Sequence, residues 1–211
     1  MNVSEPGSFI TKLRLKRIIL FNEIISNIQP PVKILDIGGT MNFWEKWGFA
    51  GDDSYEITVL NVSLSESRYS NIKTVVGDAR DLSTYSSNQF DVVFSNSVIE
   101  HVGTYDDQRR MAEEVLRVGR RYFIQTPNYY FPFEPHFLFP FYQFFPQWLK
   151  VLLIQNFNLG WRKRCPERSK AIECAKSVKL LSKKEVQELF PSSKIYEEKM
   201  LMMTYSIIAY H

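Results

Sequence analysis

The chain has 211 residues, enough for one domain with a substantial core, and its 45% hydrophobic and 23% charged residues are typical of a globular protein. A formal net charge of +3 gives no support to a nucleic-acid-binding protein. The only two cysteines, Cys165 and Cys174, cannot form a disulfide framework and have no recognised metal-ligand spacing, so we expect reduced thiols, a cytoplasmic location and no metal site.

The N-terminal segment predicts a helix over residues 8–28, because apolar residues recur there at mostly helical spacing. Ser8 is a candidate N-cap, and Pro30 and Pro31 end the helix. Basic residues interrupt the apolar ones, so we expect neither a signal peptide nor a membrane-spanning helix. The helix is expected to pack against a sheet or over the site, with binding to a membrane surface as the alternative.

Strand and helix patterns then alternate, which indicates a parallel sheet covered by helices. The predicted strands are residues 33–37, 56–62, 71–76, 90–95 and 121–126. The predicted helices are residues 41–48, 98–102 and 106–117. Right-handed crossovers between such strands bring all their carboxyl ends to one edge of the sheet.

Residues 127–165 break this pattern, since they are dense in aromatic residues and prolines that exclude a single regular helix across their first part. Ser182 and Glu185 form a capping-box pattern at the start of a helix over residues 182–190. Residues 194–200 and 204–210 predict two strands whose connection is too short for a helical crossover, so the pair is antiparallel. The expected fold is α/β: a doubly wound, seven-stranded mixed sheet with an antiparallel last strand.

The most informative motif is the sequence VKILDIGGT at residues 32–40, where a buried strand ends at Asp36 and runs into Gly38 and Gly39. Glycines in such a turn let a ligand approach the main chain closely. Because ligands of open α/β sheets bind at the carboxyl ends of the strands, the motif predicts a small-molecule site. The motif lacks the GxGxxG pattern of nicotinamide-binding folds, which disfavours a dehydrogenase.

Three further segments follow in order: LNVS at residues 60–63, VVGDARDL at 75–82 and FDVVFSNSVIEHV at 90–102. Together with LDIGGT they resemble the motifs of class I S-adenosylmethionine-dependent methyltransferases of the small, type 11-like kind. The resemblance covers about residues 30–128 and implies a Rossmann-like fold, with S-adenosyl-L-methionine as cofactor and S-adenosyl-L-homocysteine as product.

By this resemblance, Asp36 helps to orient the amino group of the cofactor, and Asp78 with Ala79 contacts the adenine. Asn61 stands where the family usually has an acidic residue that binds the ribose, and an amide is a weaker acceptor than a carboxylate. This substitution predicts a weaker ribose contact, or help from a neighbour such as Ser63. Together with the absence of a third glycine in the loop, it is the feature that favours a non-catalytic module of the same fold. The residues expected to bind the cofactor are Asp36, Gly38, Gly39, Thr40, Asn61, Val62, Asp78, Ala79, Asn96 and Ser97.

The candidate catalytic residues are His136, Glu134 and His101. Glu134 and His136 lie between prolines and aromatic residues, an unusual environment for charge that suits a general base. A hydrogen bond that braces the loop is the alternative for this pair. His101 follows the fourth predicted strand, and in the family it more often shapes the loop than transfers protons.

These observations predict methyl transfer to a small-molecule acceptor, at oxygen rather than nitrogen or carbon, with an apolar, aromatic, lipid-like or sugar-linked hydroxyl favoured. A non-catalytic module with an interaction or membrane-associated role is the alternative. Residues 137–164 could make peripheral membrane contact. We expect one domain over residues 1–211, comprising an N-terminal helix (1–30), a cofactor-binding core (30–128), a cap (129–178) and a C-terminal part (179–211); the oligomeric state is not predicted.

Overall fold

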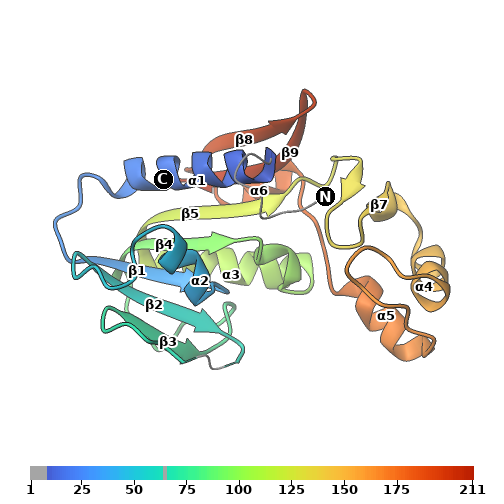
Figure 1. Ribbon diagram of the computed structural model, residues 1–211, viewed down its shortest axis with the longest axis horizontal. Helices are drawn as coiled ribbons and strands as arrows, with labels where there is room; N and C mark the ends of the chain where they lie inside the picture. Colours follow the sequence, from blue (N-terminus) through green and yellow to red (C-terminus); the bar gives the residue numbers. More distant parts are fainter. Residues whose placement is uncertain (1–8, 64–65) are drawn as a thin grey trace. The chain divides into compact units, whose positions relative to one another are not determined.

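The computed structural model describes residues 9–63 and 66–211 (Figure 1). Its internal contacts divide the chain into two compact units, which we describe separately. The first unit runs to Asn96 and includes Glu114–Ile124 and Tyr210–His211. The second unit comprises Ser97–Glu113 and Gln125–Ala209.

Seven strands form a mixed sheet in the order β3-β2-β1-β4-β5-β9-β8, with an antiparallel last strand. The strands are β1 (Val32–Ile37), β2 (Tyr55–Asn61), β3 (Ile72–Val76), β4 (Phe90–Asn96), β5 (Gly119–Pro127), β8 (Lys194–Met200) and β9 (Met203–Tyr210). β1 pairs in parallel with β2 and β4, and β2 pairs in parallel with β3. The predicted mixed sheet is therefore confirmed, and every predicted strand lies within two residues of its observed ends.

The N-terminal helix α1 (Phe9–Ile25) contributes Phe21 to the core of the first unit. The Phe21 ring lies within 5.0–6.1 Å, between ring centroids, of the rings of Trp44, Phe49, Phe94 and Phe123. Phe94 belongs to β4 and Phe123 to β5, so α1 packs on the sheet as expected.

The predicted end of this helix at residue 28 is wrong, since α1 stops at Ile25. Ser26 Oγ donates to the carbonyl of Glu23, and this local hydrogen bond competes with the helical hydrogen-bond pattern. The predicted N-cap, Ser8, lies outside the described residues.

The other predicted helices are present with small changes. They are α2 (Met41–Lys46), the 3-10 helix η1 (Ile99–His101), α3 (Tyr105–Val118) and α6 (Lys183–Leu189). α2 is two residues shorter than predicted because Gly48, at φ 78°, turns the chain away. The segment at 98–102 forms only the short η1. The predicted capping box is confirmed, since the Ser182 side chain accepts from the Glu185 amide while the Glu185 carboxylate accepts from the Ser182 amide.

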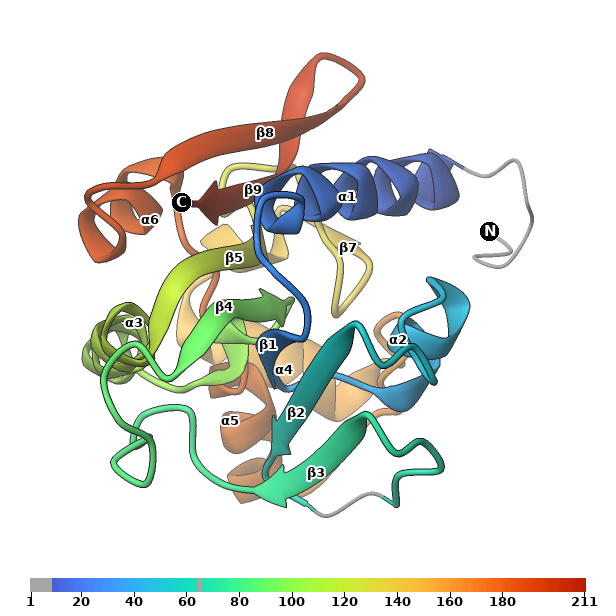
Figure 2. The same ribbon diagram turned by 90° about the vertical axis from the view of Figure 1, so that its left-hand side faces the viewer.

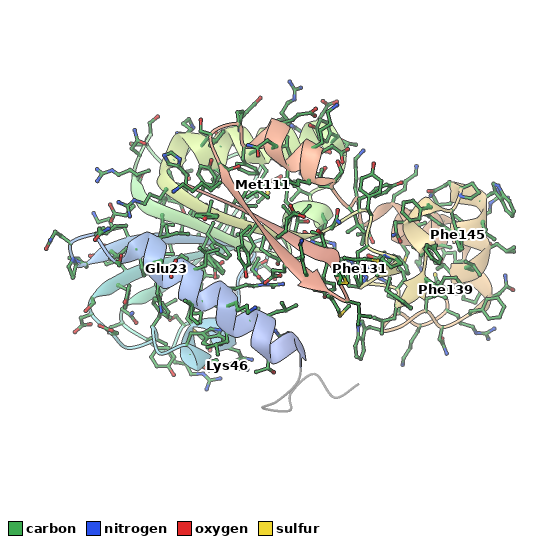
Figure 3. All side chains as sticks on the ribbon, turned by 90° about the horizontal axis from the view of Figure 1, so that it is seen from above. Glu23, Lys46, Met111, Phe131, Phe139 and Phe145 are labelled. Atoms are coloured by element: carbon green, nitrogen blue, oxygen red, sulfur yellow. The ribbon has the colours of Figure 1, made fainter. Side chains whose placement is uncertain are left out.

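The aromatic insert of the second unit is more regular than the sequence indicates. It contains the hairpin of β6 (Phe133–Glu134) and β7 (Phe139–Pro140), then η2 (Tyr142–Phe144), α4 (Gln147–Asn156) and α5 (Arg168–Lys176). Phe139 and Phe145, labelled in Figure 3, lie 5.9 Å apart between ring centroids. α4 and α5 lie side by side (Figures 1 and 2) over a core that includes Val151, Ile154, Ala171 and Ala175.

Figure 2 shows β8 and β9 joined by a tight turn. Leu201 and Met202 form this turn at positive φ, as two-residue hairpin loops require, and both side chains are exposed. Among the described residues, no helix combines the length and apolarity needed to cross a membrane.

Candidate active site

The glycine turn after β1 is built around the Asp36 side chain. Gly38 adopts φ 73°, which favours glycine, and its amide donates to the carbonyl of Leu60. A Cβ atom at Gly39 would lie 1.6 Å from Asp36 Oδ2, so this close approach excludes every residue except glycine. The predicted tight turn is therefore present, and the Asp36 carboxylate fills the space that a side chain at Gly39 would need.

Asp36 is completely buried at this strand end. Trp44 Nε1 donates to Asp36 Oδ2 at 2.6 Å, whereas no described group hydrogen-bonds to Oδ1. Burial raises the pKa of Asp36 to about 7, and the bond from Trp44 offsets part of this rise. The unpartnered oxygen is a polar group that a donor could satisfy.

Asn61, at the end of β2, ties this turn to the neighbouring strand. Its Nδ2 donates to the Gly39 carbonyl at 3.1 Å, and its Oδ1 accepts from the Val62 amide at 3.2 Å. A carboxylate at this position could not donate to the Gly39 carbonyl. Asn61, which stands in place of the usual acidic residue, therefore makes a hydrogen bond that the acidic residue could not make. Thr40 is the N-cap residue of α2, although its side chain makes no capping bond, and Val62 is exposed.

Asp78 follows β3, as predicted, but its carboxylate is bound by Arg80. Arg80 Nη2 lies 2.5 Å from Oδ2, and Arg80 Nε contacts both carboxylate oxygens at 2.9 Å. Both side chains are partly exposed, so water screens the pair. The predicted contact with an adenine amine stays a prediction. The neighbouring Ala79 is buried.

Asn96 and Ser97 stand at the end of β4, one in each unit. Asn96 Oδ1 accepts from Arg17 Nη1 of α1 at 2.9 Å. Ser97 adopts φ 57° and donates through Oγ to Gln125 Oε1 at 2.8 Å. Arg17 was not expected from the sequence to reach the strand-four motif.

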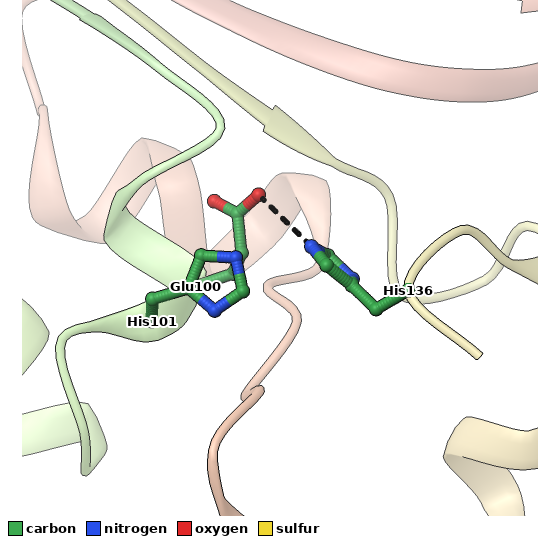
Figure 4. Close-up of side chains that lie close together, drawn as sticks. All are labelled: Glu100, His101 and His136. Atoms are coloured by element: carbon green, nitrogen blue, oxygen red, sulfur yellow. Dashed lines mark ion pairs between the residues drawn. The ribbon is translucent and has the colours of Figure 1, made fainter. Parts of the chain in front are cut away.

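Within the second unit, the predicted residues His101 and His136 lie together with Glu100, which the sequence analysis missed (Figure 4). Glu134 is almost fully buried, and its Oε1 lies 2.6 Å from His136 Nδ1. Its Oε2 accepts from the amides of His136 and Phe137. Glu134 therefore makes the loop-bracing hydrogen bonds considered as the alternative, and it also bonds to the His136 ring; the role of the pair as a general base stays a prediction.

Glu100 lies on the other side of the His136 ring, with Oε1 3.9 Å from His136 Nε2. Glu100 is completely buried, and burial raises its pKa to about 7. The pKa of His101 is lowered, mainly because the surrounding protein desolvates the ring and secondly because of the charge on His136. One signal could have identified Glu100: a carboxylate inside the apolar run before His101.

The comparisons with known proteins bear on the domain and the fold. Residues 40–122 match the family model of a methyltransferase domain. An uncharacterised protein of Mycobacterium tuberculosis is 44% identical over 49 residues, which are 23% of this chain and 17% of that protein. The chain thus spans less than a fifth of the relative's length.

Solved structures share the fold at low identity. A methyltransferase of Aquifex aeolicus described as SAM-dependent has a TM-score of 0.51 at 12% identity, with 95% of this chain and 91% of that chain covered. A SAM-dependent methyltransferase of Methanosarcina mazei has a TM-score of 0.54 at 15% identity, with 89% and 95% covered. The CurJ carbon methyltransferase has a TM-score of 0.59 at 11% identity, with 97% and 55% covered.

The matched domain and the seven-stranded sheet are those of class I methyltransferases, so the chain is similar to that class in part of its sequence and in its fold. The cofactor of the class is S-adenosylmethionine. The first unit offers such a ligand one unsatisfied polar atom, since the buried Asp36 Oδ1 has no described partner.

Proposed function

We propose that the chain transfers a methyl group from S-adenosylmethionine to a hydroxyl oxygen of a small-molecule acceptor. The observation that carries the proposal is the set of strand-end residues Asp36, Gly39 and Asn61 together with a histidine oriented by a buried carboxylate. The cofactor supplies a methyl carbon already activated by a positively charged sulfur, so the protein's main task is to position the acceptor and remove its proton.

His136 suits the role of base in this reaction. With Nδ1–H donating to Glu134, the neutral ring keeps a lone pair on Nε2 that can take the hydroxyl proton. Glu134 then stabilises the imidazolium that forms. The oxygen–methyl bond forms as the sulfur–methyl bond breaks, so the products are a methyl ether or ester and neutral S-adenosylhomocysteine.

A cavity of about 430 Å³ in the second unit supports an aromatic or apolar acceptor. Its lining includes Tyr129, Tyr130, Phe137 and Tyr142 beside Glu134. Lys150 and Lys179 also line it, which would suit an acceptor with an anionic substituent. The volume lies in the range of small-molecule sites.

The first experiment is calorimetric titration with S-adenosylmethionine and S-adenosylhomocysteine. We expect micromolar binding, about 8 kcal/mol, that is lost in Asp36→Ala and Asp78→Ala. Asp106→Ala, which removes an exposed carboxylate of α3, is the matched control and keeps the affinity. Absence of binding by the folded protein up to millimolar ligand would contradict the proposal and favour the non-catalytic module.

The second experiment measures methyl transfer to a panel of phenols, lipid-like alcohols and lipid-linked sugars. With an acceptor identified, His136→Ala should lower kcat by about 10² to 10⁴-fold while cofactor affinity stays unchanged. His211→Ala, outside this cluster, is the control. Unchanged turnover in His136→Ala would exclude the base role.

We also propose peripheral membrane contact by α4 and the residues after it. Trp148, Leu152, Phe157 and Trp161 have exposed side chains there. Lys163 and Arg164 are exposed nearby, so the surface combines apolar groups with positive charge that matches anionic lipid headgroups. An acceptor embedded in the membrane would then lie close to the bound enzyme.

A further inference from the structure

Three side chains of the second unit place potential metal ligands close together. The ligand atoms of Glu100, His101 and His136 all lie within 4.8 Å of one another (Figure 4). The two imidazole rings are perpendicular, with their centroids 4.6 Å apart. Glu100 and His101 belong to η1, whereas His136 comes from the loop between β6 and β7.

The Nδ1 atoms of both histidines already have hydrogen-bond partners. His136 Nδ1 faces Glu134 Oε1 at 2.6 Å, and His101 Nδ1 faces the Ser177 carbonyl at 3.2 Å. Both partners are acceptors, so each Nδ1 carries the proton, and Nε2 of each neutral ring is left with its lone pair. Metal-binding histidines are held in this way, by a carboxylate or a backbone carbonyl on the other ring nitrogen.

The Glu100 carboxylate supplies the independent observation. Its Oε2 accepts from Thr126 Oγ1 at 3.0 Å, but Oε1 is buried and has no hydrogen-bond partner among the described residues. The 3.9 Å between Oε1 and His136 Nε2 is too long for a hydrogen bond. A buried, unpartnered carboxylate oxygen is costly, and a cation between these atoms would satisfy it.

We propose that Glu100, His101 and His136 bind a divalent transition-metal ion of the Zn²⁺ type. Two imidazoles and one carboxylate suit such ions, whereas Mg²⁺ and Ca²⁺ prefer oxygen ligands alone. Three protein ligands leave a coordination position open for water or an acceptor oxygen. The proposal replaces the expectation of no metal site, and it does not rest on methyl transfer.

The base role proposed for His136 applies to the metal-free protein, because a bound cation would use the same Nε2 lone pair. A ring whose Nε2 binds a cation cannot accept a proton there. A hydroxyl bound to the open position would instead lose its proton more readily because the cation lowers its pKa. Glu134 then acts as a positioning residue for the His136 ring.

The test is calorimetric titration of the chelator-treated full chain with Zn²⁺, with Co²⁺ absorption as a second readout. We expect one equivalent to bind, at least 100-fold weaker in Glu100→Gln, His101→Ala and His136→Ala. Glu134→Gln should weaken binding about 10- to 100-fold. His211→Ala removes the remaining histidine and leaves binding unchanged.

Cysteines could bind Zn²⁺ by themselves, so a Cys165→Ser, Cys174→Ser double variant completes the set. Retained binding in this variant, with Co²⁺ spectra free of thiolate charge-transfer bands, supports the proposal. Binding that survives in His136→Ala, that is lost in the cysteine variant, or that is missing from the folded wild type overturns it. Circular dichroism of each variant separates lost binding from lost folding.

Discussion

Trp44 Nε1 donates a 2.6 Å hydrogen bond to Oδ2 of Asp36, and both side chains are completely buried. The indole therefore hydrogen-bonds to Oδ2 of the carboxyl group at the end of β1, whereas Oδ1 has no described partner. This relationship fixes the orientation of Asp36 and places α2 on the strand that carries it. Burial of the Asp36 carboxyl, which raises its pKa, makes the ionisation of Asp36 a determinant of stability.

Asp36 should make the protein less stable as pH rises. Its pKa is about 7 in the folded state against an ordinary value of 3.8, so the folded state holds the proton more tightly. The stabilisation is full below pH 4 and is lost as pH rises to about 7, amounting to at most about 4 kcal/mol.

Asp36→Asn removes this dependence and can still accept from Trp44. Denaturant unfolding at pH 5 and pH 8 measures the effect: the wild type should lose more stability between the two values than the variant does. Equal losses would mean that Asp36 ionises normally in the folded protein.

Gly39→Ala should disrupt the cofactor turn, because the new Cβ would collide with the Asp36 carboxylate. We expect at least a 10-fold loss of affinity for S-adenosylmethionine. Gly48→Ala is the control: Gly48 has φ 78° but an open space at the Cβ position, so it costs about 1 kcal/mol of stability without affecting the turn. Similar affinities in the two variants would count against a ligand at Gly39.

Ser182→Ala should destabilise the start of α6, because it removes the acceptor for the Glu185 amide. The expected cost is about 1 kcal/mol, or a decrease of about 2–4 °C in Tm. Ser87→Ala, at an exposed turn, is the control and should leave Tm unchanged. Thermal unfolding followed by circular dichroism measures the Tm of each variant. Equal Tm values in the two variants would show that the capping box contributes nothing to stability.

Trp148→Ala with Trp161→Ala should weaken association with anionic vesicles in a sedimentation assay. Both indoles are exposed, and indoles favour the headgroup region of a bilayer. Met202→Ala, at the exposed turn between β8 and β9, is the control. Wild-type protein that stays in solution with both anionic and zwitterionic vesicles would argue against membrane contact.

The regular part of the fold could be read from the sequence because its signals are local. Buried parallel strands such as β1 are mostly apolar, and Asp36 with Gly38 marks where this strand ends. The capping box at Ser182 is likewise a four-residue pattern. The helices of the aromatic insert were harder to predict from the sequence. α5 has alternating charged and small residues, and only its packing against α4 gives it a buried face.

The positions of the expected cofactor residues at the strand ends were predictable from the sequence, but their hydrogen-bond partners were not. The sequence places Asn61 at a strand end, yet only the fold turns its amide toward the Gly39 carbonyl. The same holds for Asp78, whose carboxylate is engaged by Arg80.

The sequence by itself determined the alternation of strands and helices and the position of the polar residues at the strand ends, because hydrophobic periodicity and glycine turns act over a few residues. Only the tertiary structure decided that Glu100 and His101 meet His136, since the path of the aromatic insert brings together groups far apart in the chain. Burial then left Glu100 Oε1 without a partner, a consequence of three-dimensional packing that no local pattern encodes.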